Sequence, residues 1–176
     1  MNIFLPYSND IGASVRSLDD LRLNKQILEC YQLLNNATKE HNGEQIKGYK
    51  NHPVYVFYKD NPYFIATYGM CCCMEYEHRF AKENQLTDDM VYLFNYWENQ
   101  IPHRVYERVA KCTFTPYYME GSKGKPNYIR TTDNVGDLFK QKLIKKWEND
   151  KAKGRPPKWT NRQVPEFYKK EILNEK

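Results

Sequence analysis

The sequence lacks any apolar run long enough to span a membrane, and its first residues lack the charged-then-apolar order of a secretory signal. Its five cysteines form no Cys-x-x-Cys pair, and three of them are consecutive at residues 71–73, which argues against a disulfide framework and against a metal knuckle. Internal repeats and low-complexity linkers are absent as well. We therefore predict one domain over residues 1–176, a cytoplasmic location with buried, reduced thiols, and neither a metal nor an organic cofactor.

Aromatic side chains are plentiful, with 15 Tyr, 8 Phe and 3 Trp. Such rings either fill a helical core or stack on exposed bases. The net charge of +5 is unevenly spread, because residues 140–176 hold 12 Lys and Arg against 5 Asp and Glu, while the remainder is slightly acidic. A basic end on a near-neutral body is common in nucleic-acid-binding proteins and also in ordinary soluble proteins. Charge alone leaves both readings open.

Helical spacing of apolar residues predicts a mainly α fold, because few segments alternate with period two. The run from Ser17 to Asp20 has the form of a capping box. The helix that it opens is expected to end near residue 35, and its apolar stripe comprises Leu23, Ile27, Tyr31 and Leu34. Its polar face carries Arg22, Lys25, Gln26 and Glu29.

Proline follows a helix-capping residue twice, at His52-Pro53 and at Asn61-Pro62. Each proline would occupy the first position of a helix. They predict a short helix over 54–59 and a long central helix from 62 to about 83. Further helices are expected over 87–97, over 102–109, and from Thr131 or Thr132 to about 147, with a loop over 113–130. The two consecutive prolines at 156–157 forbid regular helix, so the single compact domain should end in an irregular, basic, aromatic tail from about residue 151.

Four short motifs occur in a suggestive order. FLPY at residues 4–7 precedes LDDLRLNKQ at 18–26 and Glu29, and KNHP at 50–53 and Tyr68-Gly69 follow. In this succession, over roughly residues 3–80, the chain resembles the bacterial and phage branch of the endonuclease V (pyrimidine dimer DNA glycosylase) family. The tail motif RPPKW at 155–159 is similar to the family's basic, aromatic DNA-contacting end, although looser.

The resemblance implies a compact helical DNA glycosylase that flips a nucleotide and combines an N-terminal amino group with a glutamate on its first helix. By position, that glutamate corresponds to Glu29. The amine would be that of Met1, because Asn2 is too large for efficient removal of the initiator methionine, and this leaves the amine one residue out of register. The arginines beside the family's glutamate are missing, since Leu28 precedes Glu29. We therefore expect base excision without carrying over the lesion specificity or the strand-cleaving step.

Elementary chemistry also favours a carboxylate here, since base excision needs a nucleophile and a partner for the positive charge that develops on the sugar. Lys25, one turn before Glu29, would be an amine nucleophile if burial lowered its pKa. Arg22 would hold a phosphate. The alternative is an ordinary solvated Lys25–Glu29 pair at i, i+4. Asp19 and Asp20 fit helix capping better than a metal or general-base pair.

Two further groups of residues complete the predicted site. The predicted pocket residues are Tyr7, Asp20, Asn51, His52 and Tyr68. Core packing or helix capping would explain these residues as well as a role in a pocket does. In the carboxyl-terminal part, basic side chains would pair with phosphates and an aromatic ring would stack on a base. The predicted DNA-binding residues are Lys145, Lys146, Arg155, Lys158, Trp159, Arg162, Lys169 and Lys170. The alternative for this group is a solvated helix face with a tryptophan that fixes the tail to the core.

Together these features predict a monomeric DNA glycosylase that binds double-stranded DNA, excises a damaged or modified base and has no membrane partner. If a phage encodes the chain, the expected location is the host cytoplasm. Two other classes of function stay open. One is a non-catalytic DNA-binding protein of the same fold, and the other is a binder or hydrolase of a nucleotide-like small molecule.

Overall fold

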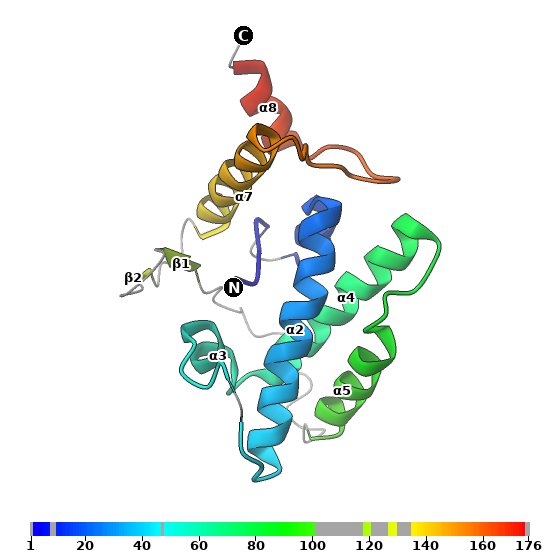
Figure 1. The fold of residues 1–176 in the computed structure, drawn as a ribbon, viewed down its shortest axis with the longest axis vertical. Coiled ribbons are helices and arrows are strands. Elements are labelled where there is room, and N and C mark those ends of the chain that lie inside the picture. Colours follow the sequence, from blue (N-terminus) through cyan, green and yellow to red (C-terminus); the bar gives the residue numbers. More distant parts are fainter. Residues whose placement is uncertain are drawn as a thin grey trace.

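The fold was analysed in a computed structural model, which describes residues 2–7, 10–46, 48–100, 118–120, 127–129 and 135–174. Helices dominate these residues, as predicted (Figure 1). They are α1 (Ile11–Ser17), α2 (Asp20–His41), α3 (Pro53–Tyr58), α4 (Pro62–Phe80), α5 (Thr87–Asn99), α7 (Val135–Ala152) and α8 (Glu166–Asn174). Two short antiparallel strands accompany them, β1 (Tyr118–Glu120) and β2 (Asn127–Ile129).

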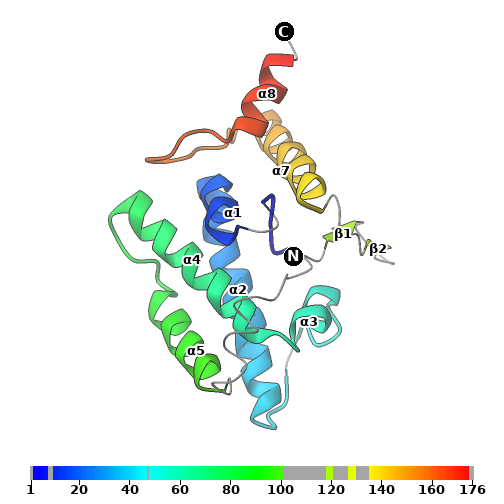
Figure 2. The same cartoon turned by 180° about the vertical axis from the view of Figure 1, so that it is seen from behind.

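Helix α2 is the centre of the fold. Figures 1 and 2 show α4 and α5 on one side of it and α3 on the other, with α7 and α8 beyond its amino-terminal end. Three residues of the predicted stripe are buried, namely Leu23, Ile27 and Leu34, and Tyr31 is partly buried. Gly69 permits the close approach of α4, because a Cβ there would lie 3.1 Å from Cys30 Cβ and 2.2 Å from Met90 Cε. Packing around this glycine gives a physical reason for the Tyr-Gly motif.

The predicted proline starts of α3 and α4 are confirmed. His52 Nδ1 accepts a hydrogen bond from the amide of Val54 at 3.2 Å, and Asn61 Oδ1 accepts one from Phe64 at 3.4 Å. The buried reading of the thiols is confirmed for Cys30, Cys72 and Cys73, whereas Cys71 is partly exposed.

The predicted capping box is wrong. Asp10 caps an earlier helix, α1, and Ser17 ends it, donating from Oγ to the carbonyl of Ser14 at 2.7 Å. Asp19 is the N-cap of α2, and the free amide of Asp20 donates to the Lys158 carbonyl at 2.8 Å. The cap therefore comes partly from a segment far away in the sequence. At its other end α2 continues to His41, six residues past the predicted end, because its last turns pack on α5 and α3.

The carboxyl-terminal third differs from the predictions in three places. Within 113–130, the described residues pair as β1 and β2, so the loop prediction is wrong there. Helix α7 extends to Ala152, and the irregular stretch covers only 153–165 before α8 begins. The predicted helix over 102–109 and the caps Thr131 and Thr132 lie outside the described residues.

Trp147 of α7 holds this carboxyl-terminal part against the body. Its side chain is fully buried, and its ring lies 5.0 Å from Trp159 and 4.8 Å from Tyr168 between centroids. Its indole Nε1 donates to Asp19 Oδ1 at 2.7 Å. Burial raises the pKa of the Asp19 carboxyl, and the bonds from Trp147 and Arg22 partly offset this effect. The contact thus joins α7 to the first turn of α2.

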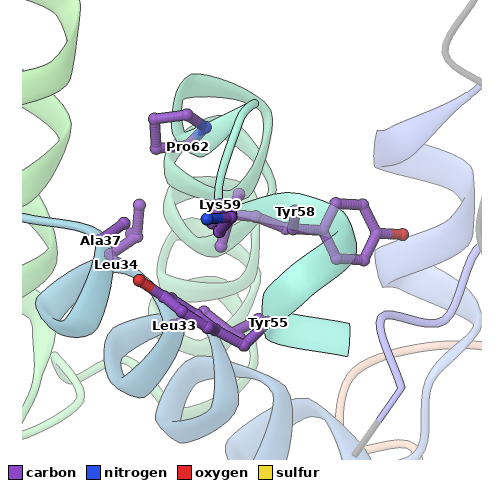
Figure 3. A pocket seen from close by; sticks show the side chains of 8 residues that line it. Leu33, Leu34, Ala37, Tyr55, Tyr58, Lys59 and Pro62 are labelled. Atoms are coloured by element: carbon purple, nitrogen blue, oxygen red, sulfur yellow. The ribbon is translucent and has the colours of Figure 1, made fainter. Parts of the chain in front are cut away.

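Figure 3 shows a small void between α2, α3 and the start of α4. Its volume is about 10 Å³, which is at the limit for one water molecule, and its lining is mostly apolar. The lining comprises Leu33, Leu34, Ala37, Tyr55, Tyr58, Lys59, Pro62 and Ile65. This void is a packing defect of the core and not a ligand site.

Replacing Trp147 with Phe should lower the free energy of unfolding by about 1–3 kcal/mol, because the buried Asp19 carboxylate loses a donor. Urea unfolding measures the loss. Trp97→Phe is the matched control, since the Trp97 indole donates to the neutral Thr38 hydroxyl at 3.0 Å on the other side of the molecule. Equal losses in the two variants would contradict a special role for the bond to Asp19.

Candidate active site

A cleft of about 250 Å³ opens between α2, the segment over residues 2–5 and α7. Its size lies near the lower end of small-ligand sites, about 300–1,000 Å³. Charged and amide side chains dominate the lining, which comprises Asn2, Phe4, Leu21, Arg22, Lys25, Gln26, Glu29, Lys146 and Asp150. The three side chains predicted to act together on the first helix, Arg22, Lys25 and Glu29, therefore face one cleft.

Glu29 has the least solvent contact of the ionisable groups in the cleft, with 6 % of its surface exposed. Its Oε2 accepts hydrogen bonds from Gln26 Nε2 at 2.8 Å and from the Asn2 amide at 3.4 Å, and Lys25 Nζ lies 3.8 Å from Oε1. Burial raises the pKa of Glu29, whereas the neighbouring positive charges and hydrogen bonds oppose the rise. Because the bonds hold Oε2, Oε1 is the oxygen better placed to take a proton or face a cation.

Gln26 positions this carboxylate and was not predicted. Its Nε2 also donates to the Asn2 carbonyl at 2.9 Å, and its Oε1 accepts from the Phe4 amide at 3.0 Å and lies 3.2 Å from the Tyr68 hydroxyl. Both amide hydrogens and one lone pair of the amide oxygen are thus occupied. The amino-terminal segment is thereby bonded across α2 beside Glu29. The only hint in the sequence is that Gln26 ends the LDDLRLNKQ motif.

The cations of the cleft differ in their surroundings. Arg22 is 12 % exposed and bridges Asp19 at 3.3 Å and Asp150 of α7. Lys25 is 63 % exposed, so the burial that would make it an amine nucleophile is missing. Lys146 of α7 is partly buried, and burial, followed by the charges of Arg22 and Lys25, lowers its pKa. Sequence reasoning placed Lys146 only among the DNA-binding residues.

The family model described as pyrimidine dimer DNA glycosylase matches residues 1–89, just over half of the chain. The chain belongs to this family. No curated protein and no solved structure matches the chain. The match includes the amino-terminal segment and α2, hence Glu29 and Gln26, whereas α7 with Lys146 lies outside it.

Four of the five predicted pocket residues of this glycosylase-family chain line neither this cleft nor a second cleft beside it, which is described below. Tyr68 is fully buried behind Gln26, with its hydroxyl 2.8 Å from the Phe4 carbonyl. His52 caps α3, Asn51 is exposed before it, and Tyr7 packs edge-on against Phe167 at 6.3 Å between centroids. The alternatives given for these residues match the contacts of three of them, capping for His52 and packing for Tyr7 and Tyr68. Met1 lies outside the described residues.

Asp20, the fifth, lines a second cleft of about 370 Å³ that borders the first, since Leu21 and Arg22 line both. Its carboxylate binds Arg79 at 3.0 Å and the Thr160 hydroxyl at 2.7 Å. The tail forms the opposite wall with Gly154, Arg155, Pro156 and Lys158. Asp20 therefore anchors the tail beside the first cleft. Among the described residues, no three His, Cys, Asp or Glu side chains are arranged as metal ligands.

The predicted DNA-binding residues separate into two groups. Arg162 makes two bonds of 2.7 Å to Glu75, Lys169 lies 2.6 Å from Glu166, and the Trp159 indole donates to the Ser17 carbonyl at 3.0 Å. These contacts match the alternative in which a tryptophan fixes the tail to the core. The remaining cations are exposed, namely Lys145, Arg155, Lys158 and Lys170, and of these Arg155 also lies 3.3 Å from Asp150 Oδ1. Of the helices in the described part of the chain, none is long and apolar enough to cross a membrane.

Replacing Glu29 with Gln should stabilise the fold at pH 7. The folded-state pKa is raised above the ordinary 4.5, so the wild type loses stability as pH rises from 4.5 through the folded-state pKa. An amide oxygen still accepts the Gln26 bond without a buried charge. Each kcal/mol gained corresponds to about 2–4 °C in Tm for a chain of this size.

Thermal unfolding at pH 7 and at pH 4 measures the effect, and the difference between the two proteins should shrink at the lower pH. Glu77→Gln, on the exposed face of α4, is the control and should leave Tm unchanged. A Glu29→Gln protein that is less stable at pH 7 would contradict the assigned cost of burying the carboxylate.

Proposed function

We propose that the protein is a DNA glycosylase that excises a damaged or modified base from double-stranded DNA, with Glu29 as the central catalytic group. The observation that carries the proposal is a buried carboxylate held by Gln26 at a charged cleft, in a chain of the pyrimidine dimer DNA glycosylase family. Stability is sacrificed to keep this charge buried, which is typical of functional groups.

In the proposed reaction, the target nucleotide leaves the base stack and enters the cleft. The oxygen of a water molecule attacks C1′ of the deoxyribose while Glu29 accepts its proton, and the N-glycosidic bond breaks with its electron pair leaving on the base. The same carboxylate stabilises the positive charge that develops on the sugar. Only 6 % of the Glu29 surface is exposed, so the carboxylate lies in an environment of low dielectric constant. Such an environment strengthens the interaction between the two charges.

The surrounding cations fit the phosphates of the same strand. Lys25 is exposed at the rim of the cleft, whereas Arg22 is held by Asp19 and Asp150 and would contact phosphate only through its free edge. In the second cleft, Arg155 and Lys158 are exposed and extend the positive surface along the tail. We infer that the duplex lies across both clefts, with its backbone over these residues.

The function is tested by a base-release assay on duplexes that carry ultraviolet photoproducts, alkylated bases or hypermodified bases, with free base quantified by mass spectrometry. Photoproducts come first because the family description names pyrimidine dimers. Glu29→Gln should lower kcat by about 10²–10⁴-fold with DNA affinity within a few-fold of wild type. Glu77→Gln should behave as wild type.

Three outcomes decide between the function classes. Release by the wild type and not by Glu29→Gln supports a glycosylase and identifies its substrate. Tight, salt-sensitive binding without any release would favour the non-catalytic DNA-binding protein. If the protein neither releases a base nor binds DNA, the small-molecule class is favoured.

The duplex placement is tested by the salt dependence of DNA affinity. Arg155→Gln with Lys158→Gln should reduce the slope of log K against log salt by about 1.8, because each lost phosphate contact contributes about 0.9. The slope is measured by fluorescence anisotropy at about 50 to 200 mM salt, where DNA affinity depends steeply on salt. Lys39→Gln, at the far end of α2, is the control, and an equal loss of slope there would contradict the placement.

A further inference from the structure

We propose that Leu21 inserts into the base stack of the bound duplex and fills the space that the extruded nucleotide leaves. The inference rests on the proposed function and adds a residue that holds the DNA in its distorted form. It concerns an exposed apolar side chain in the first turn of α2, which neither the base-excision chemistry nor the phosphate contacts use.

The position of Leu21 between the two clefts is the first support. It lines both the cleft of about 250 Å³ that Glu29 lines and the neighbouring cleft of about 370 Å³ along the tail. A duplex that lies across both clefts would therefore pass over this side chain. Two turns of helix, or about 12 Å, separate Leu21 from Glu29 along α2. A leucine in the base stack thus leaves room for the displaced nucleotide to reach the carboxylate.

The exposure of Leu21 is the second support. Leu21 is 52 % exposed, whereas Phe4, the other large apolar residue in the lining of the first cleft, is buried. Pro156 is exposed as well, but it lines only the second cleft. A single exposed leucine is ordinary on a protein surface. This one, however, lies where the surrounding linings carry mainly charged side chains.

The exposed charges on either side of Leu21 are the third support, because they suit a phosphate backbone. Lys25 is 63 % exposed and lines the first cleft. Arg155 and Lys158 are exposed and line the second. Three cations thus flank the leucine, so a backbone bound by them would bring the stacked bases against its side chain.

The aspartates in the linings do not cancel this positive surface. Asp19 and Asp150 both bind Arg22, and Asp20 binds the fully buried Arg79 at 3.0 Å. Asp19 is itself buried, with 1 % of its surface exposed. Repulsion of the backbone by these carboxylates is therefore reduced, and the exposed cations face the DNA.

An apolar wedge meets a specific need of base excision. A nucleotide that leaves the stack gives up its stacking and pairing energy, so it tends to return unless another group occupies its place. Leucine is among the apolar side chains that proteins insert between base steps. Removal of the exposed Leu21 surface from water would offset part of the cost of unstacking.

The test compares Leu21→Ala with the wild type on a duplex that reports unstacking. The duplex carries one pyrimidine dimer, or the lesion that the base-release assay identifies in its place, with 2-aminopurine as the 3′ neighbour. The fluorescence of 2-aminopurine rises when it loses a stacking partner. We expect the wild type to raise the fluorescence on binding and Leu21→Ala to raise it much less.

The same variant should show a kinetic defect without a binding defect. Its single-turnover rate of base release should fall about 10- to 100-fold, the range expected for loss of one buried leucine contact in the distorted complex. Its DNA affinity should stay within a few-fold of wild type, because the phosphate contacts are unchanged.

Two further variants serve as controls. Leu28 is also a leucine of α2 and is 44 % exposed, but it lines neither cleft. Leu28→Ala should therefore leave the fluorescence and the rate at the wild-type level. Leu21→Met keeps a large apolar side chain and should restore most of the rate. Because both leucines are exposed, all three variants should keep the wild-type Tm.

Each other outcome has a definite meaning. Wild-type fluorescence and rate in Leu21→Ala, or equal losses in Leu21→Ala and Leu28→Ala, overturn the wedge while the proposed glycosylase stands. A loss of affinity as large as the loss of rate also overturns it, since Leu21 would then be an ordinary contact. No base release from any duplex, with a fluorescence rise that Leu21→Ala lacks, supports the wedge and overturns the proposed glycosylase. No rise with the wild type overturns the wedge.

Discussion

The hydrogen bond from the Trp147 indole to the buried Asp19 carboxylate is the contact on which the candidate site depends. It docks α7 against the first turn of α2, and the Arg22–Asp150 ion pair repeats that connection one turn further along. Helix α7 thereby forms one wall of the cleft that Glu29 lines. With it, the cleft has two charged walls, in which Arg22, Lys25 and Glu29 of α2 face Lys146 and Asp150 of α7.

Burial of charge is the cost of this arrangement. Glu29 and Asp19 are both removed from water, and burial raises the pKa of each carboxyl. Hydrogen bonds from Gln26, Asn2 and Trp147 offset part of that cost, since a buried carboxylate is tolerated only when donors surround it. These hydrogen bonds therefore fix the position of the two buried carboxylates. The bond from Gln26 holds the proposed catalytic carboxylate of Glu29 in the cleft, where burial raises its pKa.

Sequence patterns predicted the parts of the fold that depend on local chemistry. The proline starts of α3 and α4 and the apolar stripe of α2 follow from φ restriction and helical spacing, which neighbours in the chain decide. The capping box failed because the amide of Asp20 finds its acceptor on Lys158, a residue that no local pattern connects to it. Helix α8 was missed because its apolar residues pack on Trp147, which makes a weak helical segment stable through tertiary contact.

By itself the sequence determined the helical class, the glycosylase family and the presence of Arg22, Lys25 and Glu29 on one side of α2. Residues three and four apart on a helix are neighbours whatever the rest of the chain does. Only the tertiary structure decided which of them is buried, that Gln26 holds the carboxylate, and that Lys146 reaches the same cleft. Burial and charge neighbourhood depend on how α7 docks on α2, and contacts between residues more than a hundred positions apart set that docking.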